Sequence, residues 1–292
     1  RVGNAPLQSL DEAQANMQLA DRWILDRLQH ATERARKSVE HYRFNDMADS
    51  IYQFFWSELC DWYIEFVKTS LAEESDPAQS EAARCVLMHV LDESMRLLHP
   101  ICPFQSEEIW QKLPGRHSRW DASIRFCAEA PYPQKDEAWI DHNATNHFAI
   151  IQETIFMVRN ARQESGLPAQ KKVPAIILVD EPDIAAMLRT HSEELCRLAK
   201  ITDLSIEARQ GFIIEKNAAT NSGQYSDVVI PLEGLIDLKA ESNRLEKELK
   251  KLKATVEKIN QLEVEFQSLS DDQLREKTAS WQEHLKSFET EL

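Results

Sequence analysis

A short basic segment around residue 160 has the residue types that bind a nucleic acid. Arg159 and Arg162 are three residues apart, so both fall on one face of the helix predicted there, and Lys171 and Lys172 follow. Guanidinium and ammonium groups bind phosphates, and Asn160 adds the donor and acceptor that reading a base edge requires. Cations near a helix C-terminus also stabilise the helix dipole, so this segment alone favours a structural role.

A second basic strip lies on a helix predicted near the C-terminus. Basic residues outnumber acidic ones along it, although the whole chain has a formal net charge of -15. The candidates for contact with a nucleic-acid backbone are Lys239, Arg244, Lys247, Lys250 and Lys251. Such point charges bind phosphate regardless of base sequence, and rising salt weakens the binding. The alternative is an ordinary solvated helix face on which Lys and Glu are mixed for solubility.

The remaining polar residues favour no catalytic site. The 6 glycines are too far apart for a phosphate-binding loop, and the 5 cysteines contain no C-x-x-C pair that would indicate zinc. His142 and His147 do not have the spacing of a helical metal pair. His99, which precedes Pro100, is better explained as a helix-end residue bonded to the backbone than as a base. We therefore expect no catalytic residue, metal or cofactor in this chain.

Length and charge restrict the class of protein. With 292 residues and 42% hydrophobic content, the chain can build a real core, as two domains or as one domain with extensions. The net charge argues against indiscriminate nucleic-acid binding but permits a locally basic face. The cysteines are odd in number and scattered, and no apolar run is long enough to cross a bilayer. We expect a cytoplasmic location, and the opening Arg1 in place of Met suggests a fragment.

A helical bundle is predicted to position the first basic segment. Apolar residues recur at steps of three and four over residues 11–40, 47–66, 85–98 and 139–165. Pro100 should end the third of these helices near Leu98, and Ser106 can begin another. The second helix carries an aromatic stripe that could stack on bases, but the same spacing is typical of core: Phe54, Phe55 and Trp62.

The pattern changes twice after the bundle. Short runs at 173–179, 201–206, 212–215 and 225–231 predict strands and residues 183–200 a helix, which together make a small α/β unit. From residue 235 apolar residues alternate in steps of four and three, a heptad seam. A capping box at 270–273 precedes a second seam. Two seams with a capped break between them predict an antiparallel coiled-coil hairpin.

Five segments resemble, in the same order, the C-terminal third of valyl-tRNA synthetases. They are Leu19-Ala20-Asp21-Arg22-Trp23-Ile24-Leu25, Cys60-Asp61-Trp62-Tyr63-Ile64-Glu65, His99-Pro100-Ile101-Cys102-Pro103-Phe104, Val158-Arg159-Asn160-Ala161-Arg162 and Ile230-Pro231-Leu232-Glu233-Gly234-Leu235-Ile236-Asp237. The first four also resemble isoleucyl and leucyl enzymes. The last, which runs into the helical hairpin, indicates the valyl branch.

The resemblance implies a mainly α fold with three parts. These are an anticodon-binding helical bundle over residues 1–166, a small α/β connector over 167–234 and a coiled-coil arm over 235–292 that binds the outer corner of tRNA. It implies that valine tRNA is the partner of this chain, that Arg159, Asn160 and Arg162 lie near it, and that the chain is a monomer. The parent enzyme joins valine to its tRNA with ATP and Mg²⁺. The His-x-Gly-His and Lys-Met-Ser-Lys-Ser signatures of that reaction do not occur here, nor does the editing domain.

One departure from the family pattern leaves alternatives open. Where the family has a Lys-Ala-Pro turn after Phe266, this chain has Leu269-Ser270-Asp271, and the returning helix is acidic. Contact between that helix and RNA is therefore not implied. The acidic charge also fits a non-catalytic protein-binding scaffold or a free-standing paralogue of the synthetase.

Overall fold

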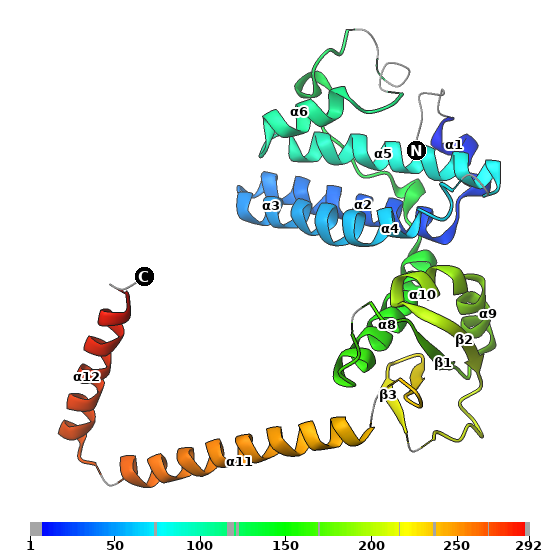
Figure 1. Ribbon diagram of the computed structural model, residues 1–292. Coiled ribbons are helices and arrows are strands. Elements are labelled where there is room, and N and C mark those ends of the chain that lie inside the picture. Colours follow the sequence, from blue (N-terminus) through cyan, green and yellow to red (C-terminus); the bar gives the residue numbers. More distant parts are fainter. Residues whose placement is uncertain are drawn as a thin grey trace. The chain divides into compact units, whose positions relative to one another are not determined.

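The computed structural model describes residues 8–72, 75–115, 120, 123–168, 170–215, 217–235, 238–267 and 269–289. The chain forms two compact units, residues 1–232 and residues 233–292 (Figure 1). The first unit is mainly helical with a small mixed sheet, and the second is built on two long helices. The predicted class, mainly α with a small α/β part, is confirmed. In the described residues, no helix is both long and apolar enough to cross a bilayer.

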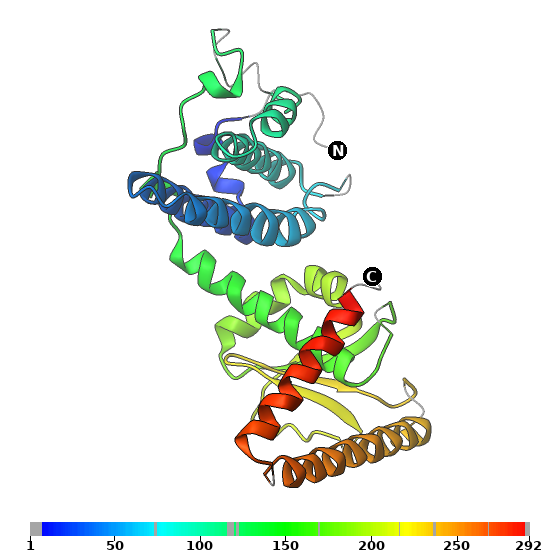
Figure 2. The same cartoon turned by 90° about the vertical axis from the view of Figure 1, so that its left-hand side faces the viewer.

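The helices up to residue 111 pack as a bundle, and the last helix before the sheet runs from this bundle along the sheet (Figures 1 and 2). The helices before the sheet are α1 (Leu10–Ala13), η1 (Gln14–Asn16), α2 (Leu19–Glu40), α3 (Phe44–Tyr52), η2 (Gln53–Tyr63), α4 (Ile64–Phe66), α5 (Pro77–Leu98), α6 (Pro103–Gln111), η3 (Cys127–Glu129), η4 (Glu137–Trp139) and α8 (His142–Glu164). The predicted long second helix is present, but its middle, η2, is a π-helix. The wider winding of a π-helix turns successive side chains through smaller angles than an α-helix does.

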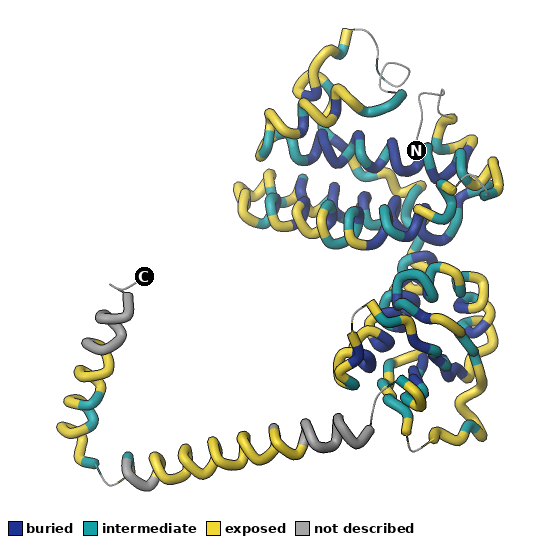
Figure 3. Tube along the Cα trace, viewed as in Figure 1, coloured by how far each residue is buried: buried dark blue, intermediate teal, exposed yellow. Residues whose placement is uncertain are grey.

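Aromatic side chains pack together where α2, η2 and α8 meet, and Figure 3 colours the buried residues of the chain dark blue. Trp23 of α2 stacks on Phe148 of α8, with ring centroids 3.9 Å apart. Phe54 and Trp62 are buried, so the core interpretation of the aromatic stripe is confirmed. Trp56, on the same π-helix, is instead 54% exposed. Phe55 is half-buried, so all three residues of the predicted stripe face the core fully or in part.

The corner between α5 and α6 is held by a buried carboxylate. Asp92 accepts hydrogen bonds from the indole nitrogens of Trp110 and Trp120, each 2.8 Å long. Arg96 donates to the carbonyl of Pro131 (2.7 Å), which ties the loop around Pro131 to α5. Helix α5 ends at Leu98 as expected.

Helix α6 begins three residues before the predicted start at Ser106. Pro103 takes its first position, where the missing N–H costs nothing. Ser106 instead donates to the carbonyl of Cys102 (2.8 Å), and its hydroxyl lies 2.9 Å from Nδ1 of His99. His99 is thus a helix-end residue, bonded to a side chain rather than to the backbone.

A four-stranded sheet follows the bundle in the order β2-β1-β4-β3. The strands are β1 (Val173–Leu178), β2 (Ile201–Glu207), β3 (Ala218–Ser222) and β4 (Asp227–Pro231); the covering helices are α9 (Pro182–Thr190) and α10 (Ser192–Ala199). Strands β1 and β2 are parallel, whereas β4 runs antiparallel to β1 and β3. The predicted single helix over 183–200 is broken at His191, which has φ -102° and ψ 23°.

One strand prediction in the α/β unit is wrong. Residues 212–215 form no strand, and Ile213 is 86% exposed. The third strand is Ala218–Ser222, a polar segment without the apolar alternation of a typical strand. It forms because β4 offers it a free edge, with Thr220 opposite Val229. Pairing with β4, rather than the intrinsic strand propensity of its residues, makes this segment a strand.

The second unit contains α11 (Leu238–Gln267) and α12 (Asp271–Glu289), separated by the predicted capped break. Backbone N–H of Ser270 donates to the Gln273 side chain (2.9 Å). The ring of Phe266, at the end of α11, lies 5.7 Å from that of Trp281, in the middle of α12.

The two apolar seams do not pack on each other along their length in the described part of the chain. The exposed seam residues of α11 are Leu249, Leu252, Val256, Ile259 and Leu262, which are 48–59% exposed. A lone pair of helices with Ser242 and Thr278 in its seams buries too little apolar surface to dictate one packing. The antiparallel coiled coil therefore stays a prediction.

Asp21, at the start of α2, should make folding stability depend on pH. Its carboxylate is buried and accepts hydrogen bonds from the Tyr63 hydroxyl (2.7 Å) and the Gln18 backbone (2.9 Å). Burial raises the pKa of Asp21 from 3.8 to about 6. Because the folded state holds this proton more tightly, Asp21 contributes most to stability below pH 4, and that contribution is lost as pH rises through about 6.

We expect Asp21→Asn to remove this component, worth roughly 3 kcal/mol, from the pH dependence of the free energy of unfolding. Urea titrations between pH 4 and 7 measure it. Tyr63→Phe is the matched control. The Tyr63 hydroxyl lowers the pKa of Asp21, so its removal should raise that pKa and extend the pH range over which the free energy of unfolding falls to higher pH. An unchanged slope in the Asn variant would contradict the assignment.

Candidate nucleic-acid interface

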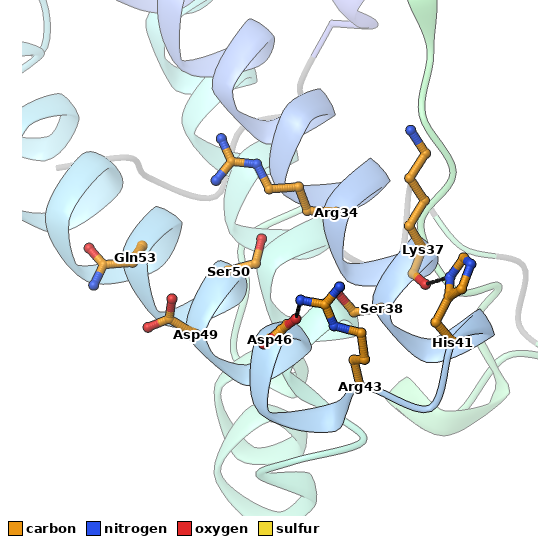
Figure 4. Close-up of a pocket in the computed structure, with 9 residues that line it drawn as sticks. All are labelled: Arg34, Lys37, Ser38, His41, Arg43, Asp46, Asp49, Ser50 and Gln53. Atoms are coloured by element: carbon orange, nitrogen blue, oxygen red, sulfur yellow. Dashed lines mark hydrogen bonds and ion pairs between the residues drawn. The ribbon is translucent and has the colours of Figure 1, made fainter.

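A cavity of about 500 Å³ lies where α2 ends and α3 begins (Figure 4). The residues that line it are all of polar or charged types: Arg34, Lys37, Ser38, His41, Arg43, Asp46, Asp49, Ser50 and Gln53. The first five residues come from the last turns of α2 and the reversal after it, and the next three come from α3, which Gln53 directly follows. The reversal therefore decides how the two sets of side chains face each other.

The reversal is closed by backbone hydrogen bonds that require a left-handed residue. The N–H of Tyr42 donates to Val39 (3.0 Å) and that of Arg43 to Ser38 (2.8 Å), the bonding pattern of a Schellman motif. Tyr42 has φ 58°, a conformation usually taken by glycine. A side chain in this region costs roughly 1–2 kcal/mol. The Tyr42 ring does not recover this by burial, because it is 82% exposed.

Further aromatic rings are exposed on the same stretch of chain. Phe44, Tyr52 and Trp56 are 59%, 56% and 54% exposed. The planes of Tyr52 and Trp56 are parallel within 3°, with centroids 6.1 Å apart. Flat apolar faces beside cations are the features of surfaces that stack bases of single-stranded nucleic acid.

The cations that line the cavity are available to an anion. The side chain of Arg34 is exposed and makes no hydrogen bond or ion pair with another described residue. Lys37 pairs with Glu33 (2.8 Å) and Arg43 pairs with Asp46, both within one helix turn and at the surface. Such exposed pairs are worth only about 0.3–0.5 kcal/mol, so a phosphate can replace the carboxylate. Nδ1 of His41 is hydrogen-bonded to the Lys37 carbonyl at 2.7 Å.

Arg162 is held inside the protein, so its predicted nucleic-acid contact stays a prediction. Arg162 is 5% exposed, and its guanidinium donates to the carbonyls of Ala199 (2.9 Å), Pro168 (3.2 Å) and Lys171 (2.6 Å). Burial, and then the neighbouring charge of Arg159, lowers the pKa of Arg162. The side chain joins the end of α8 to the end of α10 and to the chain that enters β1.

The other residues of this basic segment keep more solvent contact. Arg159 is exposed, yet it donates to the carbonyl of Leu198 (3.0 Å) and lies 5.8 Å from the Trp62 ring. Asn160 and Lys172 are exposed, and Lys171 is half-buried. The C-termini of α8 and α10 meet here, so the cations offset two negative helix ends. A contact of these four residues with nucleic acid stays a prediction.

The strip on α11 is partly described. Lys247, Lys250 and Lys251 are exposed and form no ion pair with another described residue. The side chains of Lys239 and Arg244 lie outside the described residues. The strip belongs to the second compact unit and the cavity to the first.

Sequence reasoning overlooked the cavity at the reversal. A usable signal was the alternation His41-Tyr42-Arg43-Phe44, basic and aromatic by turns, at a helix break without glycine. A helix that ends on a bulky residue in place of glycine carries a strain that packing does not explain.

Comparison with known proteins places the cavity within a family region. A model of the anticodon-binding domain of tRNA ligase matches residues 21–177. Valine–tRNA ligase of Geobacter sulfurreducens is 36% identical over 251 residues, 85% of this chain and 27% of the relative. That of Syntrophotalea carbinolica is 37% identical over 249 residues (85% and 26%), and that of Staphylococcus saprophyticus 35% over 245 residues (84% and 27%). The resemblance identified from the sequence is confirmed, and the chain spans about a quarter of these relatives.

The side chain of Arg162 should contribute to the stability of the folded chain. We expect Arg162→Ala to lower the free energy of unfolding by roughly 2–4 kcal/mol, because it leaves three carbonyls without their charged donor. Arg159→Ala, which removes an exposed cation three residues away, should cost less than about 1 kcal/mol. Urea unfolding of both variants measures the difference, and equal small losses would contradict the assigned role of Arg162.

Proposed function

Since the chain belongs to the family of anticodon-binding domains of tRNA ligases, we propose that it is the tRNA-binding C-terminal part of a valine–tRNA ligase. The longer protein would join valine to its tRNA with ATP, as the names of the relatives suggest. The proposal places ATP and Mg²⁺ in that longer protein and assigns no residue of this chain to them. A cytoplasmic location goes with it.

The observation that carries the proposal is the cavity at the α2–α3 reversal. It lies inside the family-matched residues, and it combines unpaired or exchangeable cations with exposed rings. Anticodon bases are unpaired in free tRNA, and unpaired bases are what proteins read in RNA by stacking and by edge contacts. The surface therefore suits an RNA loop better than a duplex.

Each part of the surface has its own task in the proposed complex. Arg34, Lys37 and Arg43 bind backbone phosphates and position the loop. Tyr42 and Phe44 provide faces on which a base stacks. The exposed lysines of α11 add a contact to tRNA backbone that is independent of base sequence. The net charge of -15 opposes binding elsewhere on the surface, which confines tRNA to these basic faces.

A substitution at Tyr42 tests the proposed interface without destabilising the fold. We expect Tyr42→Gly to bind valine tRNA about tenfold more weakly, because a stacking face is removed. Its free energy of unfolding should not fall, because glycine takes φ 58° without strain. Fluorescence anisotropy with labelled tRNA and urea unfolding measure the two quantities.

Tyr42→Phe is the matched control, since it keeps the ring and should bind within about twofold of the unchanged chain. Competition with an unrelated tRNA separates specific from general affinity. Equal affinity of the Gly and Phe variants, or equal affinity for both tRNAs, would refute the proposed interface.

The lysines of α11 should control the salt dependence of binding. In the variant Lys247→Gln, Lys250→Gln, Lys251→Gln, the slope of log affinity against log salt should shrink by about 0.7–0.9 for each phosphate that a lysine no longer neutralises. Arg275→Gln, on α12 and already paired with Asp272, is the control and should leave the slope unchanged. An unchanged slope in the lysine variant would remove this strip from the interface.

A further inference from the structure

A second cavity, of about 570 Å³, lies where the C-terminal ends of α8 and α10 meet. No carboxylate is among the described residues that line it, although the chain has a formal net charge of -15. Positive charge therefore gathers in this cavity without acidic partners. Its lining includes three cations, an amide and two apolar side chains: Arg159, Arg162, Lys200, Gln163, Leu167 and Leu198.

The two arginines of this cavity are bonded to backbone carbonyls, which do not neutralise their charge. Arg162 donates to the carbonyl of Ala199 (2.9 Å). Arg159 donates through Nε and one Nη to the carbonyl of Leu198 (3.3 and 3.0 Å). Each helix C-terminus carries about −0.5 charge, so the two arginines and Lys200 keep an excess of about +2 over both helix ends. Burial, and then the charge of Arg159, lowers the pKa of Arg162, as expected where like charges lie close together.

Lys200 is the cation of this cavity that the fold does not use. It is half-buried, and its side chain makes no hydrogen bond or ion pair with another described residue. It caps the end of α10 in the left-handed conformation, with φ 60° and ψ 49°, which glycine adopts without strain. A lysine near a helix C-terminus offsets the helix dipole, but the two arginines already exceed the negative charge of both helix ends. The ammonium group therefore needs a partner from outside the chain.

The remaining donors of the cavity suit one phosphate group. The ammonium group of Lys200, the amide of Gln163 and the second Nη of Arg159 make no hydrogen bond with another described residue. Hydrogen bonds from charged donors to phosphate oxygens are among the strongest in proteins. A phosphate monoester carries about −1.5 to −2 charge at pH 7, whereas each phosphodiester of a nucleic-acid backbone carries a single charge. The excess positive charge thus matches the monoester.

We propose that this cavity binds a small molecule that ends in a phosphate monoester. Lys200, Gln163 and Arg159 hold the phosphate oxygens, while Leu167 and Leu198 form an apolar wall for the organic part of the molecule. A nucleoside monophosphate has this chemistry. The proposal goes beyond the proposed function, which places tRNA on the cations of the α2–α3 reversal and of α11.

The test compares methyl phosphate with dimethyl phosphate, two probes that differ by one methyl group, on the full chain at pH 8 and constant ionic strength. The first is a dianion at this pH and the second a monoanion. Chemical-shift titration of the amides of residues 163 and 200 measures the two dissociation constants. We expect the monoester to bind about tenfold more tightly than the diester. Adenosine monophosphate should bind more tightly than methyl phosphate, because its organic part contacts the two leucines.

Lys200→Gly separates phosphate binding from folding. We expect this variant to bind methyl phosphate about tenfold more weakly, because the ammonium group is removed. The midpoint of its thermal unfolding without ligand should not fall, since glycine takes φ 60° without strain. Lys112→Gln is the matched control: it removes an exposed cation that pairs with Glu108 on α6 and does not line the cavity, so affinity should stay the same.

Three results would overturn the proposal. Equal affinity for the two probes would assign the cavity to a phosphodiester, such as an RNA backbone, in place of a monoester. Unchanged affinity in Lys200→Gly would remove the ammonium group from the site. A failure of both probes to reach saturation would show that the cavity does not hold phosphate.

Discussion

The left-handed turn at Tyr42 is the constraint on which the candidate site depends. Two backbone hydrogen bonds close the end of α2 only if residue 42 has positive φ, and the direction of α3 follows from that closure. The cations of α2 and the acceptors of α3 then face one cavity. Glycine would make the same turn with less strain, so the tyrosine ring needs a reason outside the folded chain. The proposed stacking on a base would supply that reason.

Buried charged groups hold the rest of the first unit in register. Asp92 gathers two indoles and a guanidinium beneath the α5–α6 corner, and Arg162 joins α8 to the α/β unit through three carbonyls. Each such group is costly to bury unless all its partners are present, so these contacts form together or not at all. They give the bundle a rigid frame, while the exchangeable ion pairs lie at the surface around the cavity.

The sequence predicted the helices of the bundle well because apolar periodicity and proline leave few alternatives. Helix α5 ends at Leu98 because Pro100 follows, and α8 ends before Gly166. Strand β3 could not be predicted, since its polar residues become a strand only through pairing with β4. The burial of Arg162 could not be predicted, because three-residue spacing places it on the face of Arg159 but cannot reveal that the α/β unit covers one and not the other. The cavity was missed for a similar reason, because it is made by a change of chain direction.

The π-helical segment Gln53–Tyr63 determines where the end of this helix run points. Each i to i+5 bond encloses one more residue than an α-helical bond does, so the eleven residues of the segment turn the chain through a smaller total angle. The carbonyls of Glu65 and Phe66 consequently face Arg197 of α10, whose guanidinium lies 2.6 Å from the nearer one. Deleting a single residue within the segment would return it toward α geometry and rotate those carbonyls away from Arg197. The length of the segment therefore sets the orientation of the carbonyls that bond α10.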